Sequence, residues 1–126
     1  MTFVRSLDRQ LLHRIQAGSD LLLMPSRYEP CGLNQMYGLR YGTVPVVRAT
    51  GGLADSVQHF DPERGTGTGV VFHDFDANGL RWAMNTALDL YANKYGWRIV
   101  VFNGMQKNYS WQEQGEQYLK RFRSLL

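Results

Sequence analysis

The sequence predicts an α/β fold: a partial, doubly wound (Rossmann-like) parallel sheet with flanking helices. Two observations carry this prediction. Short apolar runs alternate with longer stretches in which apolar residues recur at helical spacing. The first two runs are also separated by a helical stretch, and strands with a helix between them pair in parallel through a right-handed crossover. Because helices are expected to outnumber strands and the chain starts at a helix, we predict that residues 1–126 form a single, incomplete domain.

The first half of the chain is predicted to alternate helix and strand. Residues 6–17 form an amphipathic helix, which Gly18 ends. Leu21–Met24 and Val44–Val47 are short apolar runs that we predict as buried strands, with a helix over Gly32–Tyr41 between them. The apolar stripe of the first helix consists of Leu7, Leu11, Leu12 and Ile15.

The second half is predicted to contain an exposed loop, one strand and three helices. Gln58–Gly69 is rich in Gly, Asp, Pro and Thr, which is typical of a loop, and Gly69–Phe72 is a third short strand. Asp76 caps the next helix, and Ser110 with Glu113 forms a capping box before the last one. The apolar positions of these helices are Leu80, Ala83, Met84, Ala87, Leu88 and Tyr91, then Trp97, Val100, Val101, Gly104 and Met105, then Trp111, Tyr118, Leu119, Phe122 and Leu126.

The composition excludes several classes of protein. The net charge of +3 is small and scattered along the chain, so no nucleic-acid surface is expected. No apolar window approaches the roughly 18 residues of a membrane span, and the N-terminus lacks the apolar core of a signal peptide. The single cysteine, Cys31, excludes an internal disulfide and suits a reducing compartment. We therefore expect a cytoplasmic protein.

Residues suited to ligand binding follow the first two strands, at the edge where α/β sheets bind ligands. Glu29 is the lone carboxylate of the first loop. The next helix opens at Cys31–Asn34, where unpaired N–H groups and the positive end of the helix dipole favour an anion. Gly32 either permits close backbone approach to a ligand or is an ordinary turn glycine. Thr50–Gly52, after the second strand, either approach the same ligand or form a generic turn.

Metal, cofactor and nucleophile signatures are missing from the sequence. His13, His59 and His73 have no ligand spacing with one another or with Cys31, so no metal site is expected. Neither a P-loop nor a dinucleotide-binding glycine motif follows a strand, and we expect no cofactor. Cys31 has no histidine within its motif to activate it, which favours packing over nucleophilic catalysis.

The sequence resembles bacterial glycogen synthases and plant starch synthases over nearly its whole length. The first group of matching motifs is PSRYEPCGLNQ (25–35), Tyr37-Gly38, Tyr41-Gly42-Thr43, Pro45 and Thr50-Gly51-Gly52-Leu53 with Asp55. The downstream motifs, which follow in the same order, are Gly67-Thr68-Gly69, Gly104-Met105 and Tyr109-Ser110-Trp111.

The resemblance implies a retaining glycosyltransferase of the two-domain GT-B type, found in the cytoplasm or, in a plant, the plastid. Such an enzyme transfers glucose from ADP-glucose or UDP-glucose to the non-reducing end of an α-1,4-glucan, without a required metal. The chain would then be the last part of the nucleotide-sugar-binding C-terminal domain. The acceptor-binding N-terminal domain of the same protein, and the Arg/Lys pair that holds the donor phosphates, would be its missing partners.

The resemblance also implies roles for individual residues. Glu29 is the expected catalytic residue, in contact with the donor glucose; the alternative interpretation of a carboxylate at this place is a cap of the following helix. Tyr37 occupies the position at which the broader superfamily has a second glutamate, and is expected to contact the nucleoside. The residues expected to bind the donor sugar or phosphates are Cys31, Gly32, Leu33, Asn34, Thr50, Gly51 and Gly52.

Two alternative functions remain open at this point. One is another GT-B transferase of the sucrose or trehalose type, against which Tyr37 stands in place of the second glutamate. The other is a non-catalytic module that binds a nucleotide sugar or a glucan. Because the groups that neutralise the diphosphate and present the acceptor are expected outside the chain, we predict that the chain alone is inactive.

Overall fold

The computed structural model describes residues 2–3, 5 and 8–125, so the predictions for Ser6, Leu7 and Leu126 lie outside the described residues. The described part contains a three-stranded sheet and six helices. In chain order the elements are α1 (Arg9–Ala17), β1 (Leu21–Met24), α2 (Asn34–Tyr41), β2 (Val44–Arg48), α3 (Gly51–Ser56), β3 (Val70–Phe72), α4 (Ala77–Ala92), α5 (Lys94–Met105) and α6 (Trp111–Arg123).

The sheet is parallel throughout, as the sequence predicts. Its strands lie in the order β1-β2-β3, with Leu21 opposite Val44 and Val46 opposite Val70. The prediction that β1 is a buried strand is wrong in part, because Leu23 is 42% exposed. Among the described residues, β1 pairs with β2 only, so it is an edge strand with incomplete cover.

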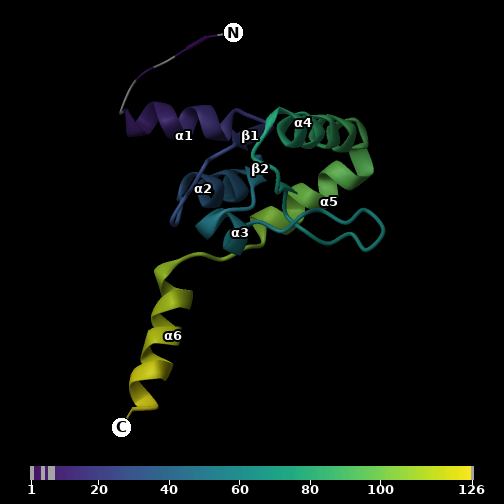
Figure 1. The fold of residues 1–126 in the computed structure, drawn as a ribbon. Coiled ribbons are helices and arrows are strands. Elements are labelled where there is room, and N and C mark those ends of the chain that lie inside the picture. Colours follow the sequence, from purple (N-terminus) through teal and green to yellow (C-terminus); the bar gives the residue numbers. More distant parts are fainter. Residues whose placement is uncertain (1, 4, 6–7, 126) are drawn as a thin grey trace.

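Helices cover both faces of the sheet, which gives three layers (Figure 1). On one face, α4 packs Ala83 and Ala87 against Val46, Val70 and Phe72. On the other face, α3 packs against Val47 and Val71, while α2 crosses between β1 and β2. α5 packs on α2 and α4 and buries Val100 against Val44 and Phe60. The core therefore lies on both sides of β2 and fixes its carboxyl end.

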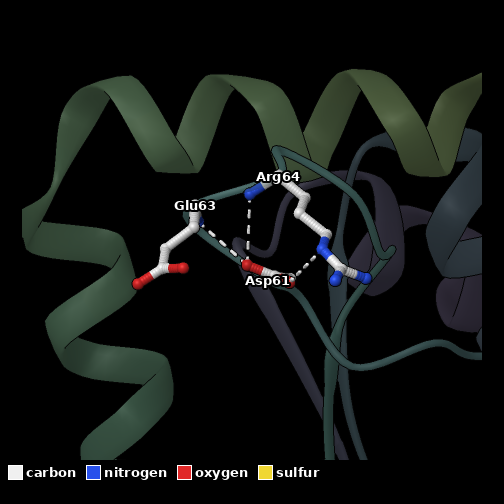
Figure 2. Close-up of polar contacts among 3 residues, drawn as sticks. All are labelled: Asp61, Glu63 and Arg64. Carbon is white, nitrogen blue, oxygen red and sulfur yellow. Dashed lines mark hydrogen bonds and ion pairs between the residues drawn. The ribbon is translucent and has the colours of Figure 1, made fainter.

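The predicted exposed loop over Gln58–Gly69 is exposed at its first two residues and at its tip but not at Phe60 or residues 67–69, so this prediction is wrong in part. At the tip, the Asp61 carboxylate accepts hydrogen bonds from the N–H groups of Glu63 and Arg64 and lies 3.7 Å from Arg64 Nε (Figure 2). The returning strand of the loop is buried at residues 67–69. Asn103 of α5 donates to the carbonyls of residues 65 and 67 at 2.9 and 3.0 Å, and so fixes the loop on α5.

Two predictions about helix starts are corrected. Thr50–Gly52 does not form a generic turn, because Gly51 and Gly52 are the first residues of α3 and Thr50 is its N-cap. The capping box of Ser110 with Glu113 is not formed, because the Ser110 side chain makes no cap bond and its N–H donates to Asn108 Oδ1 instead. α6 extends away from the rest of the molecule in Figure 1, and none of its described residues is buried.

The part of the chain that the structure describes has neither a membrane-spanning helix nor a cluster of metal ligands. No helix there has the length and apolar composition that a membrane span requires. No group of three or more His, Cys, Asp or Glu side chains lies close enough to hold a metal ion.

Candidate functional site

The loops that follow β1 and β2 meet at the carboxyl edge of the sheet. The Gly52 N–H, in the first turn of α3, donates to the Glu29 carbonyl at 3.0 Å. Gln35 of α2 is fully buried, and its Nε2 donates to the carbonyls of Cys31 and Gly32 and to Ser56 Oγ, each at 3.0 Å. These bonds bring together the two segments in which the sequence predicts a ligand site.

The glycines at the start of α3 allow this close contact. A Cβ on Gly51 would overlap the Glu29 carbonyl, and a Cβ on Gly52 would overlap the Cys31 carbonyl. Gly51 also has a φ of 45°, in the left-handed region that favours glycine. The absence of side chains at these two positions is therefore explained by packing of one loop on the other, whatever their backbones contact.

The N-terminus of α2 has no cap. Leu33 occupies the N-cap position, accepts no N–H through its side chain, and is preceded by Gly32 with a φ of 71°. The sequence places the helix start at Gly32, whereas the helix begins at Asn34. In the described residues no acceptor takes the N–H groups of residues 34–36. Unpaired N–H groups at a helix start form a binding site for an anion.

Glu29 lies beside this open helix end with its carboxylate unpaired. The side chain is half-buried, and within the described part of the chain no hydrogen bond or ion pair involves its oxygens. Because Leu33 is the N-cap of α2 and no side chain caps it, the alternative interpretation of Glu29 as a helix cap is wrong. The carboxylate is free to accept hydrogen bonds from a ligand.

Cys31 and Tyr37 are both exposed to solvent. The Cys31 thiol is exposed and lies 3.7 Å from the Gly32 carbonyl. Tyr37, which is 37% exposed, has its ring centroid 5.0 Å from that of His13 on α1. It also lines an open groove of about 810 Å³ between α2 and the segment 105–112. Tyr37 therefore lies on the solvent side of α2, one turn after the open end.

Sequence reasoning missed the residues that hold the two loops together. Gln35 ends the PSRYEPCGLNQ motif, but no sequence pattern indicates a role for it or for Ser56. Ser56 Oγ donates to the Gly52 carbonyl, and the Ser56 carbonyl accepts a hydrogen bond from the Tyr109 hydroxyl at 2.7 Å. Burial raises the pKa of Tyr109, which favours the protonated donor form. The only sequence signal for Gln35 is a polar residue on the side of α2 that packs inward.

A family model described as "Glycosyl transferases group 1" matches residues 1–96 of the chain. Curated relatives include a glycogen synthase of Anaeromyxobacter sp. (strain K), which is 52% identical over 118 residues, or 94% of this chain and 25% of that protein. A glycogen synthase of Koribacter versatilis is 48% identical over 113 residues, or 90% of this chain and 23% of that protein. The chain thus spans about a quarter of the length of these relatives.

Two solved structures resemble the fold. The catalytic domain of starch synthase IV from Arabidopsis thaliana, bound to ADP and acarbose, matches with a TM-score of 0.81 and 37% identity, over 91% of this chain and 24% of that one. Sucrose-phosphate synthase from Thermosynechococcus elongatus matches with a TM-score of 0.71 and 28% identity, over 98% of this chain and 30% of that one.

Proposed function

Because the chain belongs to the group 1 glycosyltransferases, we propose that it forms part of the donor site of a retaining glucosyltransferase of the glycogen or starch synthase type. The enzyme transfers glucose from ADP-glucose or UDP-glucose to the non-reducing end of an α-1,4-glucan. The chain supplies the last part of a nucleotide-sugar-binding GT-B domain. The single observation that carries this proposal is the uncapped start of α2 beside the unpaired carboxylate of Glu29.

In the proposed reaction, the chain holds the donor while the bond between glucose and diphosphate breaks. The acceptor hydroxyl forms the new bond on the same face of the sugar, and its proton passes to the leaving phosphate oxygen. Glu29 accepts hydroxyl hydrogen bonds from the donor glucose and stabilises positive charge that develops on the ring. The N–H groups at the start of α2 stabilise the negative charge of the sugar-phosphate portion.

The remaining site residues have supporting roles in the proposal. Cys31–Asn34 and Thr50–Gly52 line the donor with backbone groups, since their loops are packed together at the sheet edge. Tyr37 contacts the nucleoside from the first turns of α2. Diphosphate neutralisation and acceptor binding come from the remainder of a longer polypeptide, because the chain spans about a quarter of its relatives.

The choice of nucleotide and acceptor is supported by the starch synthase IV structure, which is bound to ADP and acarbose. That protein is 37% identical to this chain over 91% of this chain's residues. The sucrose-phosphate synthase match is weaker in both identity and TM-score, so ADP-glucose and a glucan are preferred to a sucrose-type reaction.

The proposal is tested by a chimera in which this chain replaces the matching segment of the Anaeromyxobacter glycogen synthase. Transfer of labelled glucose from ADP-glucose to glycogen is measured for the chimera, for the parent enzyme and for the isolated chain. We expect activity in the first two and none in the isolated chain. A folded chimera that binds ADP-glucose without transfer would favour the non-catalytic module.

A further inference from the structure

Arg48, the last residue of the central strand β2, reaches the loop that carries Glu29. Its Nε donates to the Ser26 carbonyl at 2.9 Å, and its Nη2 donates to the Arg27 carbonyl. Both carbonyls belong to the segment between β1 and Glu29. The guanidinium thus binds two successive backbone groups of that loop with two parallel donors, a geometry that a planar guanidinium provides.

The same guanidinium also contacts the segment that follows β3. Its Nη1 lies 3.5 Å from the His73 carbonyl, and its central carbon lies 5.0 Å from the centroid of the Phe75 ring. A cation over an aromatic face is attracted by the ring electrons. One side chain at the end of β2 therefore joins the segments that leave both neighbouring strands.

The charge of Arg48 is not used in an ion pair. Within the described residues the only ion pair joins Asp61 and Arg64, and every acceptor of Arg48 is a neutral backbone carbonyl. Binding of two carbonyls by one side chain depends more on the forked geometry of the guanidinium than on its charge. A lysine at position 48 has one compact ammonium group and cannot donate to both loop carbonyls in the same geometry.

We propose that Arg48 is a positioning residue that fixes Glu29 for the donor; this inference rests on the proposed function. The loop is held before Glu29 by the last residue of β2, and at Glu29 itself by the first turn of α3. Arg48 binds the two carbonyls at positions 26 and 27, and the Gly52 N–H binds the Glu29 carbonyl itself. Loss of the Arg48 contacts releases the first of these two attachments and lets the carboxylate move.

Hydrogen exchange of the isolated chain tests the attachment without any assumption about activity. In Arg48→Lys and Arg48→Gln, we expect the Gly52 amide to exchange about 10-fold faster than in the wild type, because local opening of the loop becomes more frequent. The Val46 amide in the core serves as the internal reference. Arg81→Lys is the matched control, since Arg81 bonds only Asn78 on its own helix. Unchanged Gly52 exchange in both Arg48 variants would overturn the inference.

Kinetics of the chimera test the consequence for Glu29. Both Arg48 variants should lower kcat about 10- to 100-fold, since a displacement of a reacting group by about 1 Å has that effect, while KM for ADP-glucose changes little. A direct charge contact with the phosphates predicts instead that Arg48→Lys keeps wild-type kinetics, and that result would refute the positioning role. If the unsubstituted chimera is inactive, the proposed function fails, and hydrogen exchange still decides whether Arg48 holds the loop.

Discussion

The helices α2 and α4 both follow a strand of the same parallel sheet, yet their N-termini differ. The N-cap of α4 is Asp76, whose Oδ1 accepts the N–H groups of Asn78 and Gly79 at 2.8 Å each. The N-cap of α2 is Leu33, whose side chain offers no acceptor. A carboxylate at a helix start satisfies the free donors and cancels the positive end of the dipole. The end of α4 is therefore closed to an anion, and that of α2 is open.

An open helix start has a cost in stability. A missing cap costs roughly 1 kcal/mol, and α1, α4 and α5 each avoid this cost with the side chain of Asp8, Asp76 or Asn93. The other three described helices, α2, α3 and α6, have no side-chain cap, and of these α2 is the one that follows the Glu29 loop. In the proposed function, the donor takes the place of a cap at α2.

The largest expected effect is that of Glu29→Gln on the open side. The substitution removes the negative charge and preserves the size of the side chain, so in the chimera kcat for glucose transfer should fall about 100-fold. Glu63→Gln is the matched control, because Glu63 lies at the tip of the exposed loop and its carboxylate has no partner in the described residues. Equal rates for the two variants would remove Glu29 from the reaction.

Closing the open helix should have the next largest effect. In Leu33→Asp, a carboxylate stands where α2 begins, so the affinity of the chimera for ADP should fall about 10-fold through repulsion of the diphosphate. The unfolding free energy of the isolated chain should rise by about 0.5 kcal/mol through the helix dipole. ADP inhibition and urea unfolding measure the two effects. Leu33→Asn lacks the charge, and affinity lost equally in this control would point to a steric effect.

The start of α4 and the strands beside it were predictable from the sequence, because the residues that determine them lie close together in the chain. The alternation of apolar runs and helical stretches identified β2, β3 and α4, and Asp76 stands directly before the first turn that it caps. Local patterns also misled: Ser110 with Glu113 has the spacing of a capping box, but Asn108 takes the N–H of Ser110. The same motif is compatible with more than one hydrogen-bond arrangement at a helix start, and the neighbouring residues decide which arrangement forms.

For the start of α2 and the loop around Glu29, the sequence predicted which residues belong to the site but not how they are arranged. The motif around Glu29 could be recognised, whereas the contacts that shape it join residues distant in sequence. Arg48 binds the carbonyl of Ser26, and Gly52 packs on the carbonyl of Cys31. Every residue has a backbone carbonyl, so no pattern of residue types in the sequence predicts either contact. For the same reason the glycine pair suggested a loop, although α3 starts there.

Removal of the cap on the closed side should affect stability alone. Asp76→Ala leaves the N–H groups of Asn78 and Gly79 without their acceptor, and the unfolding free energy of the chain should fall by about 1 kcal/mol. Asp76→Asn retains an acceptor and should lose only a fraction of this amount. The affinity of the chimera for ADP should remain at the wild-type value in both. A clear loss of affinity would show that the two helix starts do not act independently.

The stability of the region around α4 should also depend on pH, through His59. Its ring stacks on Trp82 of α4 with centroids 5.7 Å apart, and its Nδ1 accepts the Val71 N–H at 3.1 Å, which requires the neutral ring. Burial, and then the nearby His73, lower the pKa of His59 below the ordinary value of 6.5. The unfolded chain therefore binds a proton first as the pH falls. This contribution to stability is complete above about pH 6.5 and decreases below it.

Urea unfolding between pH 7.5 and pH 5 measures this effect, which should be the smallest of the four because the ring is only partly buried. His59→Asn keeps an acceptor close to the position of Nδ1 but cannot be protonated, so its stability should fall less over this range than that of the wild type. His13→Asn is the control, because His13 lies beside Tyr37 and Tyr41 on the open side. If His13→Asn removed the pH dependence and His59→Asn did not, the sensitive group would lie at α2, and the assignment of the pH response to the closed side would be wrong.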